Sequence, residues 1–547
     1  MEIIHIALRT GYSFKKVFGD VNNLFEYKTG HSIGFADEGN CFSHSYVAKK
    51  AATDDTLNPL YGIRLTVVPD ATERVKPRGQ FGNEYIFIAK NYEGLREIYR
   101  ITKVFSDNFY YRGNISLHDV LGLSENVFVI AENFSDSRRI DFIGLSPRTS
   151  KKTLEDNPEL PRVAMCDNYY PKAPDKQVYE LLTAPKSDTK ITAQHILTTI
   201  EWKRLFKNSG EDLAEAIYNT HFISENCEKI TLEQAPMIKS IDGQKIEFLC
   251  KIGAKRLGLD ITSDGEYKDR YEREMILIKE KNYDDYFLVV ADVIRWAKQR
   301  MFVGPSRGSS AGSLVCYLLG ITEVDPIPYD LIFERFIDIN RGDLPDIDID
   351  FPDDKRESVI KYLRQKYGED KVKQIATISR MKPKIAISEW AKGLRIPAFE
   401  TEELKNSIVE RSSGDARAAM CLLDTFETID TGKQFLQDFP AMKSVAEIEN
   451  HPRHHGVHAA GVIVCNDKIE NFVGINSRDN TIMCDKADVE SLNLLKIDIL
   501  GLRTLAVLAD CADQVGMEYK SFYSLPLTDE KVYEVFNDLR LSGIFQF

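Results

Sequence analysis

Residues 345–351 read Pro-Asp-Ile-Asp-Ile-Asp-Phe, and this alternation decides how the middle of the chain is expected to fold. Alternating acidic and apolar residues are typical of a β-strand with one buried face, and they put Asp346, Asp348 and Asp350 on the other face. Carboxylates two positions apart on a strand lie roughly 6–7 Å apart, which suits a pair of Mg²⁺ ions about 3.5–4 Å apart. A plain solvent-facing edge strand is the alternative. Spacing alone does not choose between Asp346/Asp348 and Asp348/Asp350 as the catalytic pair.

A second strand-like run, Leu-Leu-Lys-Ile-Asp-Ile-Leu-Gly-Leu, occupies residues 494–502. Lys496 and Asp498 fall on one face of this apolar segment. Burying an aspartate without a partner is costly. The run therefore predicts either a lysine–aspartate pair satisfied locally or a third carboxylate directed at the same metal ions.

A glycine- and serine-rich loop, Gly-Pro-Ser-Arg-Gly-Ser-Ser-Ala-Gly-Ser, covers residues 304–313. It follows an expected strand at 302–303 and precedes an expected helix from about 310 to 319. Such a loop exposes backbone N–H groups, the helix start adds a positive dipole end, and Arg307 adds a charged donor. The spacing of a Walker A loop is missing, so the alternatives are another kind of phosphate loop or a plain connection. Upstream, apolar residues at helical spacing predict a helix over 268–300 with a break at Asn282.

Two further segments carry charge or potential metal ligands. Residues 355–395 hold twelve Lys/Arg against four Asp/Glu, which indicates either a solvated helix face or a track along a phosphate backbone. Residues 451–458, His-Pro-Arg-His-His-Gly-Val-His, contain four of the ten histidines. Neither a neighbouring cysteine nor a His-Glu-x-x-His order supports zinc. Arg453 and His458 could equally contact phosphate or DNA.

The composition bounds the class of protein. The chain has 547 residues with 43% hydrophobic and 28% charged residues, which is typical of a globular protein of several domains. No run of about 18 apolar residues predicts a membrane span, and the amino terminus does not read as a secretory signal. Nine scattered cysteines indicate reduced thiols in the cytoplasm. The net charge of −13 argues against a small, uniformly basic DNA-binding protein.

Apolar runs at 85–88, 127–130 and 140–143 predict buried strands of an α/β domain over 1–225.

Taken together, the motifs resemble the C-family replicative DNA polymerases, the bacterial DNA polymerase III alpha subunits. The matching stretches occur in family order at 286–337, 344–368, 453–464, 494–505 and 542–547. The resemblance is strong over about 225–547 and weak over 1–225. It implies a multidomain α/β fold. A degenerate, barrel-like polymerase-and-histidinol-phosphatase (PHP) domain at 1–225 is followed by a nucleotidyltransferase-beta-like palm at 226–377 and 454–515. A helical thumb at 378–453 is inserted in the palm, and the fingers begin at 516–547.

The same resemblance implies the site residues of a two-metal nucleotidyl transfer. The catalytic and metal-binding residues are Asp346, Asp348 and Asp498, which would hold two Mg²⁺ ions with Mn²⁺ as a substitute. The residues expected to bind the incoming nucleotide are Gly304, Arg307, Gly308, Ser309, Ser310, Arg335 and Lys496. The residues expected to grip DNA are Lys382, Lys384, Arg453 and His458.

The amino-terminal domain resembles the PHP domain in an eroded form. Of the family's His-x-His-x-His start only His5 remains, and Arg9 follows it. Asp-His-Gly-Asn becomes Asp-Glu-Gly-Asn at 37–40, Arg64 stands where a glutamate is expected, and Asp-x-His becomes Asp-Asn-Tyr at 167–169. A cation at a metal site opposes metal binding. We therefore expect no phosphoesterase activity from this domain and a role as a scaffold.

The resemblance also predicts the partners. Family members continue well beyond the Gly-Ile-Phe-Gln-Phe motif at 543–547, so the chain is expected to be either one half of a split polymerase or a fragment. In the split case a second chain would carry the fingers and the clamp-binding region, and a phage-infected bacterial cell would suit such a gene. The expected function is template-directed DNA synthesis on primer–template DNA from dNTPs, in the cytoplasm and without a membrane, with the sliding clamp reached through the second chain. A catalytically silent replisome scaffold is the alternative, and a metal-dependent phosphoesterase is a weaker one.

Overall fold

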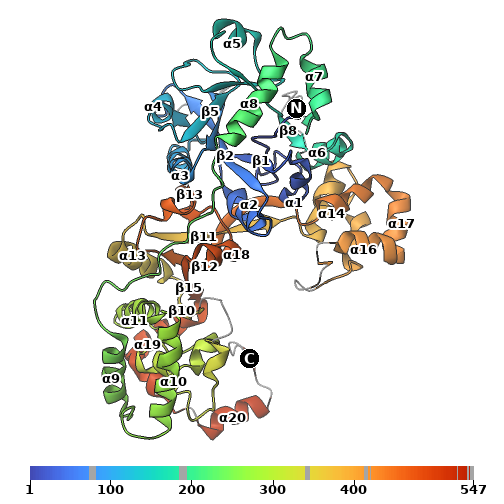
Figure 1. Cartoon of the computed structure of the whole chain (residues 1–547). Coiled ribbons are helices and arrows are strands. Elements are labelled where there is room, and N and C mark those ends of the chain that lie inside the picture. Colours follow the sequence, from blue (N-terminus) through green and yellow to red (C-terminus); the bar gives the residue numbers. More distant parts are fainter. Residues whose placement is uncertain are drawn as a thin grey trace. The chain divides into compact units, whose positions relative to one another are not determined.

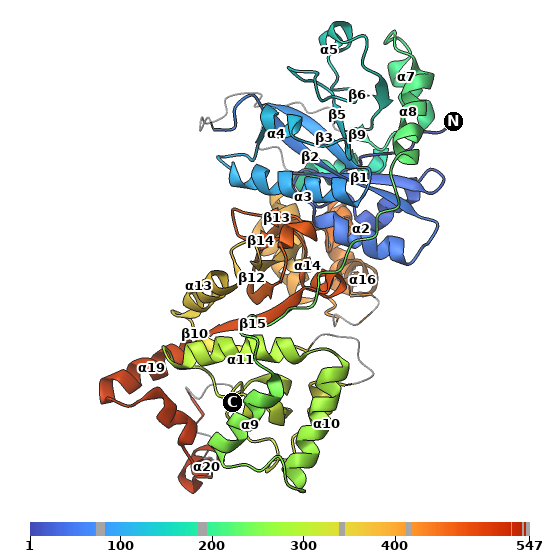
Figure 2. The same cartoon turned by 60° about the vertical axis from the view of Figure 1, so that its left-hand side comes forward.

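The computed structural model describes residues 1–72, 82–183, 194–338, 345–411, 415, 417–418, 420–526, 528–538 and 541–542. The motif expected at 543–547 lies outside these described residues. The chain divides into two compact units (Figures 1 and 2). Unit 1 comprises Met1–Glu233, Ala376–Val457 and Glu470–Asp488, and unit 2 comprises Gln234–Ile375, His458–Ile469 and Val489–Phe547. Across the described ranges, every helix is too short or too polar to traverse a lipid bilayer.

Unit 1 is built on a seven-stranded sheet with the order β1-β2-β3-β5-β6-β7, in which β4 pairs with β2. The apolar runs at 85–88 and 127–130 form β3 and β5, as predicted. The run at 140–143 enters β6 only at Phe142, because Ile140 lies in a turn closed by its N–H and the Ser137 carbonyl. The strands are β1 Ser32–Glu38, β2 Asn58–Val68, β3 Asn83–Ala89, β4 Ile115–Ser116, β5 Val127–Ala131, β6 Phe142–Leu145 and β7 Arg162–Ala164.

Amphipathic helices cover this sheet. Helix α3 (Tyr92–Asp107) packs on β3 and β2 through buried Leu95 and Ile98. Its amino terminus is capped by the Asn91 side chain, which accepts the N–H of Gly94. Helix α2 (Phe42–Ala52) packs on β2, and α8 (Leu213–Glu225) packs on β7. All nine cysteines of the chain are free, and eight of them are buried.

A separate helical cluster of unit 1 lies within the range predicted for the thumb. Its core contains Trp390, Leu422, Phe435 and Met442. The assignment of this cluster as a thumb stays a prediction. Its elements are α14 Pro383–Gly393, α15 Glu402–Asn406, α16 Cys421–Thr428, α17 Asp430–Asp438 and the 3₁₀ segment η6 Pro440–Ile448.

Unit 2 combines helices with a short stretch of sheet. Strand β10 (Asp348–Pro352) pairs in parallel with β15 (Leu495–Leu502), and β15 pairs antiparallel with residues 461–464 of β12 (Pro452–Val464). The helix predicted over 268–300 is present as α10 (Glu266–Glu280) and α11 (Asp284–Lys298). It breaks at Asn282, whose φ is 57°, as predicted. The other helices are α9 Ile246–Leu257, α12 Leu314–Leu318, α13 Arg356–Tyr367, α19 Arg503–Val515 and α20 Glu530–Asn537.

Two predictions about the loop at 304–313 were wrong. The helix expected from about 310 to 319 is only α12, because the Ser313 side chain accepts the Cys316 N–H and starts the helix there, after a 3₁₀ turn at Gly308–Gly312. Residues 302–303 are buried but do not form a strand. The Tyr523 hydroxyl donates to the Val303 carbonyl (2.6 Å) and accepts the Val303 N–H (3.2 Å), so a side chain supplies the partners that a neighbouring strand would have provided.

Candidate active site

The register of two strands brings the predicted carboxylates together. Asp348 is the first residue of β10 and lies directly opposite Asp498 of β15. Asp346 precedes the strand and is exposed, whereas the isoleucines between the aspartates are buried in the core of unit 2. Ligand atoms of Asp346, Asp348 and Asp498 lie within 4.8 Å of one another. In the described part of the chain, no other group of three histidine, cysteine, aspartate or glutamate side chains is this close.

The electrostatics of this triad favour a cation. The Lys496 ammonium donates to Asp346 Oδ2 and to Asp498 Oδ2, both at 2.8 Å. Burial disfavours the charge on Lys496, but the two aspartates outweigh burial and raise the pKa of Lys496 above its usual range. Burial, together with the charges of Asp346 and Asp498, raises the pKa of Asp348. Lys496 thus offsets part of the repulsion between the carboxylates. The remaining repulsion, together with burial, still disfavours the negative charge of Asp348.

One buried oxygen of the triad has no hydrogen-bond partner among the residues that the structure describes. Asp498 Oδ1 is buried and unpaired, and a buried acceptor left in this way costs about 1–3 kcal/mol. A bound cation would satisfy it, and an all-carboxylate donor set is the kind that Mg²⁺ and Mn²⁺ prefer. The residues present therefore fit a divalent metal site.

The glycine- and serine-rich loop runs along the carboxylate face of β10. The Gly304 N–H donates to the Asp350 carbonyl at 2.9 Å, and a Cβ on Gly304 would lie 2.8 Å from Asp350 Cβ. Gly308 has a φ of +66°, and a Cβ there would lie 3.0 Å from Asp348 Oδ2. Both positions therefore require glycine for the backbone to approach the strand this closely.

The nucleotide-binding residues expected in this loop differ in their surroundings. Arg307 Nη1 donates to Asp350 Oδ1 at 3.1 Å. Burial raises the pKa of Asp350, and Arg307 opposes this effect. Ser310 is buried and its hydroxyl donates to the Arg307 carbonyl, whereas Ser309 is exposed. Arg335, in the 3₁₀ turn η4 (Phe333–Arg335), is exposed as well.

Sequence reasoning missed Glu274, a buried residue of α10. Its carboxylate accepts the Ser313 hydroxyl and the N–H groups of Leu314 and Val315. Arg270, one turn earlier on α10, neutralises Glu274 with a 2.7 Å ion pair. The positive end of α12 is thus occupied by Glu274. The start of α12 is therefore not available to a phosphate. The features of the loop that remain available for binding phosphate are its backbone N–H groups and the guanidinium of Arg307. Only the Arg–Glu spacing of four residues on α10 could have signalled the pair.

The residues expected to grip DNA fall in both units. Lys382 and Lys384 are exposed at the start of α14 in unit 1, with Glu410 at 3.8 Å from Lys384. Arg453, also in unit 1, donates to Glu389 at 3.0 Å. His458 belongs to unit 2, where its Nδ1 accepts the N–H of Gly461 at 2.8 Å. Their role on DNA stays a prediction.

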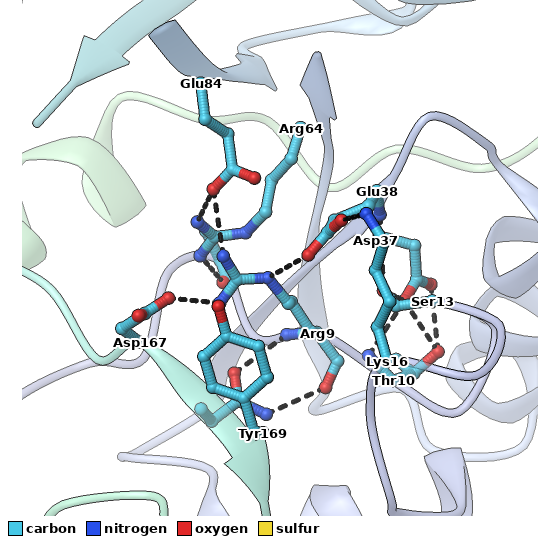
Figure 3. A network of polar contacts seen from close by, with 12 residues as sticks. Arg9, Thr10, Ser13, Lys16, Asp37, Glu38, Arg64, Glu84, Asp167 and Tyr169 are labelled. Carbon is cyan, nitrogen blue, oxygen red and sulfur yellow. Dashed lines mark hydrogen bonds and ion pairs between the residues drawn. The ribbon is translucent and has the colours of Figure 1, made fainter. Parts of the chain in front are cut away.

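The residues predicted to form an eroded metal site in the amino-terminal domain place guanidinium groups among carboxylates (Figure 3). Arg9, fully buried, forms ion pairs with Glu38 (3.1 Å), Glu84 (2.9 Å) and Asp167. Arg64 pairs with Glu84 at 3.1 Å. Cations of the protein therefore lie between these carboxylates.

These ion pairs set the protonation of the cluster. Burial alone would raise the pKa of Glu84, but Arg9, Arg64 and Arg148 outweigh burial and hold that pKa below its usual range. Glu132, less well compensated, has a raised pKa because of burial and the charge of Asp167. Burial lowers the pKa of His5, the remaining histidine of the family motif, to about 4. These groups do not fit a cluster of metal ions.

Comparison with known proteins defines the class. Residues 244–501, which contain the carboxylate triad and the loop, match the family model described as "Bacterial DNA polymerase III alpha NTPase domain". Relatives extend the similarity to the whole sequence, so the chain is similar over its whole length to bacterial DNA polymerase III alpha subunits.

The individual relatives all carry the name DNA polymerase III subunit alpha. That of Streptococcus pyogenes serotype M6 is 27% identical over 98% of this chain and 52% of its own length. That of Aquifex aeolicus is 26% identical over 100% of this chain and 55% of its own length. That of Halalkalibacterium halodurans is 34% identical over 61% of this chain and 31% of its own length. The chain spans about half the length of the curated relatives that it matches throughout.

Proposed function

We propose that this chain is the palm-bearing part of a replicative DNA polymerase and carries out template-directed transfer of nucleotides from dNTPs to a primer 3′-OH. The carboxylate triad carries the proposal. Asp346, Asp348 and Asp498 converge from two strands, and Asp498 Oδ1 is buried without a partner. Clustered carboxylates repel, so a chain that only binds DNA gains nothing from keeping them together.

The residues of the site have separate roles in this proposal. Asp346, Asp348 and Asp498 would hold two divalent cations, Mg²⁺ or Mn²⁺. When bound, these cations supply activation of the primer hydroxyl and stabilisation of the charge that develops on the phosphates. The backbone of the loop at 304–310 and the guanidinium of Arg307 orient the triphosphate beside the triad. Lys496 offsets the negative charge of Asp346 and Asp498 and would contact the reacting phosphates.

Further partners follow from the same proposal. Lys382 and Lys384 contact the duplex backbone, which a polymerase recognises through its charge while base pairing selects the nucleotide. The amino-terminal domain acts as a scaffold, because the guanidinium groups of Arg9 and Arg64 occupy its former metal site.

Two measurements test the proposal. The first is Mn²⁺ binding, followed by electron paramagnetic resonance, for the chain, for Asp348→Asn and for Asp353→Asn. Asp353 is an exposed carboxylate close in sequence and serves as the matched control. We expect Asp348→Asn to weaken Mn²⁺ binding at least tenfold and Asp353→Asn to leave it unchanged.

The second measurement is primer extension by the chain alone and by the chain mixed with a polypeptide that carries the half of a relative that this chain does not match. We expect extension in the mixture, and its loss with Asp348→Asn. Mn²⁺ binding without extension in either case would favour the silent scaffold. Extension that persists with Asp348→Asn would overturn the proposal.

A further inference from the structure

Asp350 is the third acidic residue of the alternating strand, yet it lies outside the metal-binding group. The carboxylates whose ligand atoms lie within 4.8 Å of one another are Asp346, Asp348 and Asp498. On β15, Asp350 faces Leu500, whereas Asp348 faces Asp498. The residue opposite Asp350 on the partner strand is thus apolar and does not explain why an aspartate stands at position 350.

The glycine- and serine-rich loop supplies the reason. Arg307 Nη1 donates to Asp350 Oδ1 at 3.1 Å and lies 3.5 Å from Oδ2. The Asp350 side chain is 9% exposed and that of Arg307 is 34% exposed. The pair is therefore shielded on the carboxylate side and open to solvent on the guanidinium side.

The geometry leaves most of the guanidinium available. A guanidinium has five N–H donors in a rigid fork, and within the described residues the contacts of the Arg307 fork all use Nη1 and all end on Asp350. Nη2 and Nε can therefore bind an anion while Nη1 stays on Asp350. A guanidinium held in this way loses less side-chain freedom when it binds a phosphate than a free one would.

The backbone anchors the same loop to the same residue. The Gly304 N–H donates to the Asp350 carbonyl at 2.9 Å, and only a glycine fits there, because a Cβ would lie 2.8 Å from Asp350 Cβ. Asp350 thus fixes the loop at its first residue through the main chain and at Arg307 through the side chain. Both contacts hold the loop beside Asp348, whose Oδ2 would lie 3.0 Å from a Cβ on Gly308.

We propose that Asp350 is a positioning residue that holds Arg307 and its loop in the geometry that binds a nucleoside triphosphate, and that it is not a metal ligand. The inference rests on the proposed function, because it assigns the loop to the triphosphate. Without Asp350 the guanidinium would have to be ordered by the nucleotide itself, which lowers affinity for the nucleotide and leaves the metal site intact.

The test measures two affinities on the full chain. Mn²⁺ binding is followed by electron paramagnetic resonance, and dATP binding is measured by equilibrium dialysis at saturating Mn²⁺. The variants are Asp350→Asn, Arg307→Lys, the double variant and the control Asp353→Asn. We expect Asp350→Asn and Arg307→Lys each to weaken dATP binding about tenfold and to leave Mn²⁺ binding within about twofold. The double variant should bind dATP no more weakly than the single variant with the lower dATP affinity, because both residues act through one contact.

Each contrary result has a distinct meaning. If Asp350→Asn weakens Mn²⁺ binding as much as Asp348→Asn does, Asp350 is a metal ligand and the inference is wrong. If dATP binds the unsubstituted chain and Asp350→Asn equally, the pair serves only the stability of the fold, and the inference alone is overturned. If the unsubstituted chain binds Mn²⁺ but no dATP, the proposed function fails and the inference fails with it.

Discussion

Replacing Arg9 by methionine tests whether the amino-terminal domain is held together by guanidinium groups in place of metal ions. The Arg9 side chain is 0% exposed and pairs with Glu38, Glu84 and Asp167, whose side chains are 14%, 19% and 2% exposed. Methionine fills most of the volume and removes the charge. The substitution leaves buried carboxylates without their main partner, a situation that costs about 3–5 kcal/mol for one broken buried pair.

The remaining cations of the cluster set the size of the effect. Arg64 still pairs with Glu84, and Arg148 still lies 3.4 Å from Asp167. We therefore expect the lower part of that range, about 3 kcal/mol of unfolding free energy. The loss should shrink at low pH, because the unpaired carboxylates can then be protonated.

The assay is urea unfolding of the full chain followed by tryptophan fluorescence. Trp202 is a suitable probe, since it is buried in unit 1 and its indole N–H donates to the carbonyls of Leu145 (3.3 Å) and Met165 (3.2 Å). The matched control is Arg138→Met, which removes an ion pair with Asp136 from a side chain that is 68% exposed. Exposed pairs contribute about 0–1 kcal/mol. If Arg9→Met destabilises unit 1 no more than Arg138→Met does, or if added Mn²⁺ or Zn²⁺ restores its stability, the reasoning is refuted.

Three further predictions concern pH and the candidate active site. Burial lowers the pKa of His5 and of His44 to about 4, so the unfolded chain takes up protons first as the pH falls below about 6.5. Unit 1 should therefore lose stability between about pH 6.5 and pH 4, by roughly 2 kcal/mol per histidine at pH 5, and each His→Gln variant should flatten the pH profile of unfolding. Lys496→Met removes the ammonium that competes for two carboxylates, and Mn²⁺ binding measured by calorimetry should tighten about tenfold; weaker binding would contradict this. Gly308→Ala and Gly243→Ala place alanine at similar φ values of +66° and +64°. Gly308→Ala alone meets the carboxylate of Asp348, so it alone should weaken Mn²⁺ binding, and an equal effect of both would count against the proposed geometry.

Local patterns predicted much of the candidate site. The alternation at 345–351 predicted one buried and one acidic face, and the structure buries Ile347 and Ile349 while it brings Asp346 and Asp348 into the triad. For the run at 494–502 the sequence left two readings of Asp498 open. The structure contains the contacts of both, because Lys496 bridges Asp498 and Asp346 while Asp498 also lies in the cluster of three carboxylates with Asp346 and Asp348.

Other features could not be predicted, because they depend on side chains distant in sequence. Glu274 occupies the start of α12 from another helix, and Tyr523 supplies the hydrogen bonds that were expected from a strand at 302–303. A pattern of single residues contains no information on which distant side chain will cap a given backbone segment. The loss of histidines predicted an eroded metal site, but only the fold brought Arg9 and Arg64 between the carboxylates.

The sequence by itself determined the apolar strands at 85–88 and 127–130, the helical stretch that breaks at Asn282, the acidic face of one strand and the residue types that can bind metal and phosphate, because period and composition are local properties of the chain. The tertiary structure decided which of these residues meet. Asp348 and Asp498 face each other because β10 and β15 pair in parallel in one register, although their carboxylates are separated by 150 residues. A shift of that register by one residue would turn the side chains of a strand to the opposite face and disperse the triad. The register is fixed by the packing of the buried isoleucines in the core of unit 2.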